Sequence, residues 1–294
     1  MAGCVTPQVA ELHAQRDPSL PERVELTAVP FFPQAEYQCG PAALATVLSH
    51  AGVATTPDAL VAQVYIPGRE GSLQTEMLAS TRRHGLVAYR LAPRLENVLK
   101  EVAAGYPVVV LQNLSFDFAP VWHYAVVIGY DFARDEIVLR SGVTERLAVT
   151  MSNFERTWAR GRHWAMLPLP PKRLPATASA DGVVADVAAL ERLHPAEAKL
   201  AYEAALVRWP DHPVASLGLG NAAYRLRDLK SAESAYRRTA EAHPGSADAW
   251  NNLAQVLFEQ GRKAEAREAA LRAVTLGGAR LKTYEETLRT ITAP

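Results

Sequence analysis

The sequence predicts two domains of different fold class: an N-terminal domain that mixes helices with strands, and a C-terminal domain built only from helices. Helical and strand-like patterns alternate up to about residue 168, where a proline-rich stretch begins. Beyond this stretch the chain is rich in alanine and resembles itself at an offset of 34 residues. A length of 294 residues with 49% hydrophobic content is sufficient for two buried cores.

Charge and hydropathy disfavour two classes of partner. Lysine plus arginine number 31, as do aspartate plus glutamate, so no basic field attracts nucleic acid or acidic lipid. The apolar runs stay below the roughly 18 residues that a membrane-spanning helix needs. We therefore expect no nucleic acid partner, and a membrane contact only through a lipid anchor.

Residues 1–25 are polar and punctuated by prolines, and we expect a flexible leader there. The leader begins Met1-Ala2-Gly3-Cys4, which resembles the end of a bacterial lipoprotein signal, where the cysteine becomes lipidated. This resemblance implies a lipid anchor on Cys4 and a place in the bacterial cell envelope. The other interpretation is an unmodified cysteine in a leader, with a cytoplasmic protein if the N-terminus is complete as given.

The first domain is expected at residues 26–168, entered through an extended segment at 24–33. Gly52 and Gly85 end two of its predicted helices. Helices are predicted at 39–50, from 57 onward, at 72–84 and at 95–104, and strands at 86–90 and 107–112. The last of these is a continuous apolar run, which is typical of a buried strand.

Cys39 lies where the extended segment meets the helix that Gly40 and Pro41 begin, and proline is well tolerated in a first helical turn. Unsatisfied backbone N–H groups at a helix N-terminus lower the pKa of a nearby thiol, which makes it a better nucleophile. Gln34, five residues earlier, can donate its side-chain amide to the oxyanion that forms when a thiolate attacks a carbonyl. The competing interpretation is a buried, inert cysteine beside a surface glutamine.

His123 opens a strongly apolar strand, 84 residues after Cys39. A neutral imidazole at this place can take the thiol proton or pair with the thiolate. A lone histidine on a strand can also be structural. The order of glutamine, cysteine and histidine favours the catalytic interpretation, with Gln34, Cys39 and His123 as its members.

These residues resemble a known family. Gln34, the run Cys39-Gly40-Pro41-Ala42-Ala43-Leu44 and the run that His123 opens are together similar to the C39-like branch of the papain-like cysteine peptidases. The resemblance implies an α+β domain, in which a helix bundle carries the cysteine, an antiparallel sheet carries the histidine and a cleft lies between them. The best-known members cut leader peptides after a Gly-Gly pair as domains of export transporters. No transporter segment is present here, so we do not expect that substrate.

The chain departs from this pattern at the third catalytic position. The family carries an aspartate near the end of the strand that follows the histidine strand, and this sequence has Ser141 there. A serine can accept a hydrogen bond from the imidazole and orient it, but it supplies no negative charge. Gln112 and Asn113 are further candidates for this position. Asp131 and Asp135 are expected to be solvated residues of a turn, outside the site.

A proline-rich linker is predicted at residues 169–182, followed by repeats at 183–290 that resemble tetratricopeptide repeats. Two full units are expected at about 213–246 and 247–280, after a degenerate unit at 183–212. Alanines and aromatics recur 34 residues apart, including Ala198, Ala232 and Ala266, and Tyr202 and Tyr236. The resemblance implies a groove for a peptide or protein partner. We expect Asn221, Asn251 and Asn252 to line it; a plain helical bundle without a binding role is the alternative.

The sequence thus predicts a thiol peptidase that cleaves a peptide or protein through a Cys39–His123 acyl-enzyme mechanism, with the repeats recruiting substrate or partner. Two alternatives stay open. One is a weak or inactive peptidase-like scaffold or peptide-binding protein of the envelope, and the other is a thioester-based acyl or peptidyl transferase. No cofactor is implied. No metal site is expected either, because the histidines and cysteines lack the spacing of metal ligands.

Overall fold

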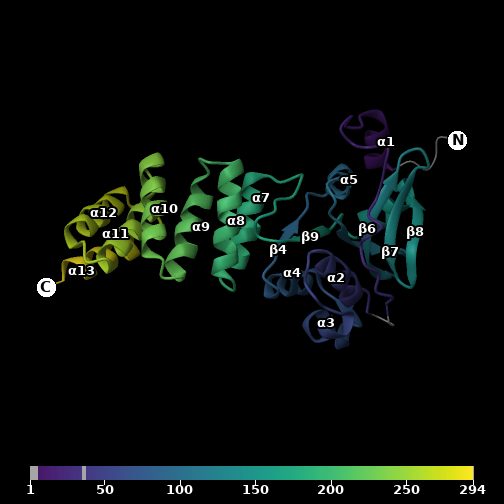
Figure 1. The fold of residues 1–294 in the computed structure, drawn as a ribbon, viewed down its shortest axis with the longest axis horizontal. Coiled ribbons are helices and arrows are strands. Elements are labelled where there is room, and N and C mark those ends of the chain that lie inside the picture. The colour runs from purple at the N-terminus through teal and green to yellow at the C-terminus, as the bar shows by residue number, and fades with distance from the viewer. Residues whose placement is uncertain (1–5, 35–37, 294) are drawn as a thin grey trace. The chain divides into compact units, whose positions relative to one another are not determined.

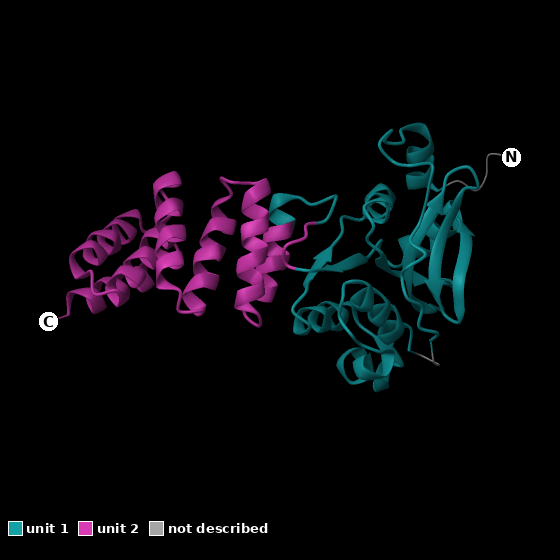
Figure 2. Cartoon of the chain, viewed as in Figure 1, with its two compact units in different colours: residues 1–170, 175–182 teal, residues 171–174, 183–294 magenta. Residues whose placement is uncertain are grey.

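The structure is a computed structural model that describes residues 6–34 and 38–293, which fall into two compact units (Figures 1 and 2). The first unit comprises residues 1–170 and 175–182, and the second comprises residues 171–174 and 183–294. The first contains helices and an antiparallel sheet, whereas the second is a run of helices. This confirms the predicted fold class. Within the described residues, no helix is both long and apolar enough to cross a membrane.

Helices and strands are interspersed along the chain of the first unit. Its helices are α1 (Pro7–Ala14), α2 (Cys39–His50), α3 (Pro57–Val64), η1 (Pro67–Arg69), α4 (Gln74–Arg83), α5 (Leu95–Ala103) and α6 (Met151–Arg160). Its strands are β1 (Arg23–Glu25), β2 (Tyr65–Ile66), β3 (Gly71–Ser72), β4 (Val87–Arg90), β5 (Val108–Asn113), β6 (Trp122–Asp131), β7 (Glu136–Ser141), β8 (Thr144–Thr150) and β9 (Ala165–Leu169). Strands β2 and β3 form a separate hairpin.

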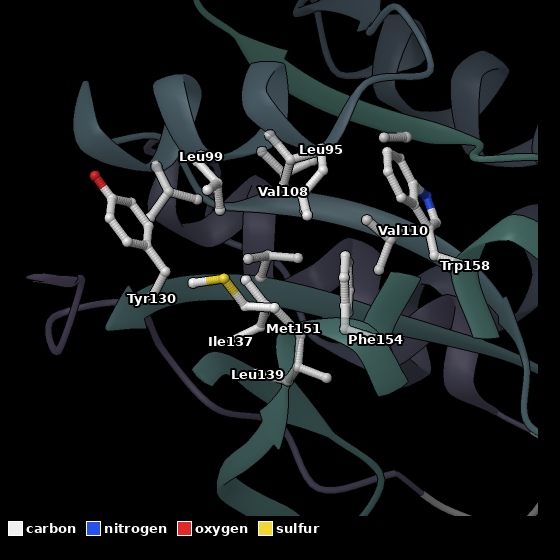
Figure 3. Packing of buried hydrophobic residues seen from close by; sticks show 14 of the residues in the cluster. Leu95, Leu99, Val108, Val110, Tyr130, Ile137, Leu139, Met151, Phe154 and Trp158 are labelled. Atoms are coloured by element: carbon white, nitrogen blue, oxygen red, sulfur yellow. The ribbon is translucent and has the colours of Figure 1, made fainter. Parts of the chain in front are cut away.

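The main sheet has seven strands in the order β4-β9-β5-β6-β7-β8, with β1 pairing with β6, and every pairing is antiparallel. Successive side chains along its central strands point to opposite faces of the sheet, and both faces are buried. Val108 and Val110 pack in the core with α5 and α6, whereas Val109 and Leu111 pack in the core with α2, α3 and α4. Figure 3 shows the first of these cores. Helices cover both faces, and this explains why β5 and β6 are buried at nearly every position.

The leader was predicted to be flexible, and in residues 6–25 this prediction is wrong. Helix α1 buries Val9 and Leu12 against the core that contains α5 and α6. The Glu155 carboxylate accepts the backbone N–H groups of Gln8, at 3.0 Å, and Val9, at 2.8 Å, which satisfies donors that a helix N-terminus leaves free. The proposed lipid anchor, Cys4, lies outside the described residues.

The predicted linker is also fixed in part. Leu169 ends strand β9, and helix α7 (Ala180–Glu191) begins at Ala180. Between them, the fully buried Glu101 carboxylate accepts the backbone N–H groups of Ala176, at 3.0 Å, and Thr177, at 2.8 Å. A buried carboxylate needs such donors, so residues 176–177 are held against the first unit rather than forming a semi-rigid spacer.

The second unit continues α7 with six further helices: α8 (Pro195–Arg208), α9 (Pro213–Arg225), α10 (Leu229–Ala242), α11 (Ala247–Glu259), α12 (Lys263–Leu276) and α13 (Leu281–Thr292). The repeated alanines, Ala198, Ala232 and Ala266, are fully buried where neighbouring helices meet. Gly218 allows a close approach, because an added Cβ would lie 2.3 Å from the Tyr202 ring. Small residues therefore let large aromatic rings fill the space between the helices.

Candidate active site

Cys39 is the first residue of α2, and its free thiol is half-buried. The helix is buried along most of its length, which fixes the position of its first turn. Gly40 is required there, because an added Cβ would lie 2.1 Å from the Ser72 Oγ of β3. The hairpin β2–β3 therefore packs directly against the turn that carries the thiol.

Two opposing influences act on the thiol. Burial raises the pKa of Cys39, and this is the larger effect. The backbone N–H groups of Tyr124, Gly40 and Cys39 itself act in the opposite direction, because they stabilise the thiolate. Since the net shift is upward, the resting form at neutral pH is the protonated thiol.

His123 lies near the start of β6 and is 8% exposed. Its Nε2 is 2.8 Å from the Ser141 Oγ. Strands β6 and β7 pair Val126 with Arg140, so Ser141 comes opposite Ala125. Ala125 is two residues after His123 in β6, and Ser141 and His123 therefore lie diagonally across the two strands on the same face of the sheet. Burial lowers the pKa of His123, so its resting form at neutral pH is the neutral imidazole.

Cys39, His123 and Gln34 line one cavity of about 940 Å³. Residues 69–74 line this cavity, as do residues 120–124 and 161–162. The backbone N–H of Gln34 donates to the Gly142 carbonyl at 3.1 Å, which fastens the segment before Cys39 to the turn after β7. Residues 35–37, between Gln34 and the helix, lie outside the described residues.

The alternative candidates for the third position have other roles. The Gln112 amide donates to the Thr157 hydroxyl at 2.6 Å, and the Asn113 Oδ1 accepts two backbone N–H groups of the following loop. The expectation of a solvated Asp131 is wrong: it is 8% exposed at the end of β6 and accepts the backbone N–H of Arg134 at 3.1 Å. Asp135 lies in the turn, 3.2 Å from the His13 ring.

The three asparagines predicted to contact a peptide form one hydrogen-bonded chain in the repeats. Asn252 donates to the Asn221 Oδ1 at 3.2 Å, and Asn251 donates to the Asn252 Oδ1 at 3.3 Å. The Tyr236 hydroxyl also donates to Asn221, at 2.8 Å. Asn251 is buried, whereas Asn221 and Asn252 are partly exposed, so these two are the ones accessible to a partner.

Two features of the site were not predicted from the sequence. The backbone N–H of Tyr124 lies beside the thiol, and the Arg140 side chain is buried next to Ser141. The first had a signal, since Tyr124 follows His123 directly. The second had none, because the partners of Arg140 are backbone carbonyls, which every residue carries.

Comparison with known proteins agrees with the two-unit organisation. The peptidase C39-like family model matches residues 26–166, and a tetratricopeptide repeat model matches residues 187–246 and 219–280. No significant match is found among curated proteins. Among solved structures, the chain is similar to a C39-like peptidase from Bacillus anthracis, with 20% identity and a TM-score of 0.44 over 51% of this chain and 98% of that one.

Two further structures each cover less than half of the chain. A double-glycine motif protease from a transporter, solved with its leader peptide, has 22% identity and a TM-score of 0.37 over 48% of this chain and 90% of that one. The first tetratricopeptide domain of Spaghetti, bound to an HSP90 peptide, has 19% identity and a TM-score of 0.36 over 38% of this chain and 90% of that one. The resemblance inferred from the sequence is confirmed: the chain contains a peptidase C39-like domain at residues 26–166, followed by tetratricopeptide repeats at residues 187–280.

Proposed function

We propose that the N-terminal domain is a cysteine peptidase in which Cys39 attacks a peptide carbonyl and His123 moves the proton. The observation that supports this most directly is the shared cavity of Cys39, His123 and Gln34, together with the 2.8 Å contact between His123 Nε2 and Ser141 Oγ. That contact occupies Nε2, so Nδ1 is the ring nitrogen that would accept the thiol proton.

The reaction begins from a neutral pair, since burial raises the pKa of Cys39 and lowers that of His123. The thiol proton passes to His123 as the sulfur bonds to the carbonyl carbon, and the carbonyl oxygen becomes an oxyanion. The Gln34 amide and the Cys39 backbone N–H stabilise that oxyanion. The C–N bond then breaks, the amine leaves with the proton from His123, and water hydrolyses the thioester.

Ser141 sets the tautomer of His123 only weakly. His123 can act as a base through Nδ1 when Nε2 carries the hydrogen and donates it to Ser141. A serine hydroxyl can equally donate to Nε2, which places the hydrogen on Nδ1 and blocks proton transfer from the thiol. A carboxylate would only accept, and it would therefore select the productive tautomer.

We further propose that the repeats bind a peptide or protein, either the substrate or a partner. Their helices offer the partly exposed amides of Asn221 and Asn252, which can each donate to and accept from a peptide backbone. Substituting both by alanine should weaken co-purification of a bound peptide without changing cleavage of a short peptide by the N-terminal domain. Equal peptide retention in the double variant would contradict this role.

A second candidate function is a peptide-binding protein with a catalytically silent cleft. It is favoured by the serine at position 141, because without a carboxylate the imidazolium lacks a counter-charge. An enzyme that transfers the acyl group to an amine is a third outcome, since the thioester intermediate is the same.

The test uses the full chain, a peptide library and mass spectrometry of the products. Wild type should cleave peptides, whereas Cys39→Ala and His123→Ala should lose cleavage by at least about 10³-fold. His13→Ala is the matched control, because His13 is an exposed histidine of α1. Ligated products would indicate a transferase. Binding of peptides without any Cys39-dependent product would reject the peptidase and favour the silent cleft.

A further inference from the structure

Arg140 is a buried cation beside the candidate active site. It lies in β7 directly before Ser141, and its residue is 8% exposed. Its side chain lines a small cavity together with Gln34, Cys39 and Ser141. No step of the proposed reaction uses its charge.

The guanidinium bonds to backbone carbonyls from two separate segments. It donates to the carbonyl of Val29 at 2.9 Å and to that of Thr27 at 3.3 Å, both in the segment that leads to Gln34. It also donates to the carbonyl of Glu145 in β8 at 2.6 Å. Arg140 therefore ties the chain that precedes Gln34 to the β7–β8 hairpin.

Burying the Arg140 guanidinium carries a desolvation free energy that packing alone does not offset. Burying a guanidinium removes it from water, and its one carboxylate neighbour among the described residues, Glu145, is 3.9 Å away with a side chain that is 69% exposed. The Nε of Arg140 is buried and has no hydrogen-bond partner in the described part of the chain. An unbranched apolar side chain such as methionine would bury no charge at this position. The planar fork of arginine, however, can reach several carbonyls at once.

The tether has two fixed ends around the oxyanion donor. Arg140 holds the carbonyls at 27 and 29, and the Gly142 carbonyl accepts the backbone N–H of Gln34 at 3.1 Å. Both attachments come from the same few residues of the sheet, which also carry Ser141. We propose that Arg140 is a positioning residue. By fixing the backbone before Gln34, it places the Gln34 side-chain amide relative to Cys39 and so sets the geometry of the oxyanion site.

This inference rests on the proposed function for its catalytic meaning, but its structural part can be tested without activity. Arg140→Met keeps an unbranched side chain that reaches about as far as the arginine Nε, and it removes the guanidinium fork. Arg146→Met is the matched control, because Arg146 lies in the neighbouring β8 and pairs with Glu25 at the surface. In the Arg140→Met variant, hydrogen exchange of the Gln34 backbone N–H, which bonds to the Gly142 carbonyl, should become at least tenfold faster, while the control stays within twofold. Unchanged exchange in Arg140→Met would overturn the tether.

The catalytic part is tested with a peptide aldehyde and with iodoacetamide. The Cys39 sulfur adds to the aldehyde carbon, and the thiol proton ends on the former carbonyl oxygen, which occupies the oxyanion site. Alkylation by iodoacetamide forms an S–C bond, breaks the C–I bond and releases iodide and the thiol proton, without any oxyanion. Arg140→Met should weaken aldehyde binding at least tenfold and leave the alkylation rate within twofold, with partial recovery in Arg140→Lys.

A double variant separates positioning from a general loss of stability. If Arg140 acts through Gln34, adding Gln34→Ala to Arg140→Met should weaken aldehyde binding by less than about twofold more. Independent, multiplying losses would overturn the proposal. If wild type binds no aldehyde at all, the proposed peptidase function fails. Hydrogen exchange of the Gln34 backbone N–H then decides whether Arg140 positions this segment.

Discussion

Replacing Ser141 by aspartate should convert the neutral resting pair into a thiolate and an imidazolium. The Ser141 Oγ lies 2.8 Å from His123 Nε2, so a carboxylate oxygen placed there is about 3 Å from the imidazole. At an effective dielectric constant of about 20, unit charges at that distance attract by about 5–6 kcal/mol. Much of this is offset by removing the carboxylate from water. A net rise of about 1–3 units in the pKa of His123 remains, equivalent to about 1.4–4 kcal/mol.

The sign of the effect on the thiol follows from the same pair. In wild type, burial raises the pKa of Cys39, so its thiolate fraction at pH 7 is below the roughly 3% of an ordinary thiol. In the proposed mechanism the imidazolium pairs with the thiolate, so stabilising the imidazolium lowers the pKa of Cys39. We therefore expect the rate of iodoacetamide alkylation at pH 6.5 to rise at least about tenfold in Ser141→Asp. In wild type, the alkylation rate should instead rise once with increasing pH, at a pH above the usual pKa range of a thiol.

The assay follows alkylation of Cys39 by mass spectrometry from pH 5 to pH 10. Ser141→Asn is the matched control, because asparagine has the size of aspartate without its charge. The gain in Ser141→Asp should also disappear when His123→Ala is added. Equal alkylation of the Asp and Asn variants at pH 6.5 would refute the reasoning, since it would mean that His123 does not pair with the Cys39 thiolate.

Three further predictions concern pH and packing. Peptide cleavage by wild type should stay active below pH 6.5, because burial lowers the pKa of His123 and the imidazole stops accepting a proton only below that lowered value; a pH–rate profile measures this. Gly218→Ala should destabilise the repeats by about 1–3 kcal/mol in urea unfolding, since the new Cβ would meet the Tyr202 ring at 2.3 Å. Glu101→Gln should speed proteolysis within residues 170–179, because a neutral amide oxygen accepts a weaker hydrogen bond from the Ala176 backbone N–H than a carboxylate does.

Each of these has a control in the same chain. Gly245→Ala should be nearly neutral, because nothing lies within 4 Å of the added Cβ, and a loss equal to that of Gly218→Ala would contradict the packing argument. Glu96→Gln, on the same helix as Glu101 but paired with Lys100 near the surface, should leave proteolysis of residues 170–179 unchanged. An acid limb centred above pH 6.5 would contradict the lowered pKa of His123.

Local patterns predicted the elements of the site well. The glycine and proline after Cys39 marked the start of α2, and the apolar runs marked β5 and the strand of His123. These features depend on neighbours in sequence, so their signal is local. Antiparallel register then decides which side chains meet, and it places Ser141 beside His123.

The interactions that hold the site in place were not predictable in the same way. Arg140 bonds to the carbonyl of Val29, 111 residues earlier, and Glu101 accepts from the backbone of Ala176, 75 residues later. Backbone groups carry no sequence signature, so a charged residue in a strand or helix reveals nothing about such a partner. The leader was misjudged for a related reason, because the carboxylate that caps α1 comes from Glu155.

The serine at position 141 and the proposed tether at position 140 bear on the same step of the proposed reaction. With a neutral resting pair, the thiolate forms only as the sulfur attacks, so the imidazolium and the oxyanion appear together in the transition state. No carboxylate at position 141 stabilises the positive charge, and the negative charge must be stabilised by the donors from Gln34 and Cys39. Donors act in full only when they are already in place, because reorganisation during the reaction consumes their benefit. A peptidase site that lacks the carboxylate therefore depends more on a rigid oxyanion donor, and this is the role that we propose for the buried Arg140, which bonds to the chain before Gln34.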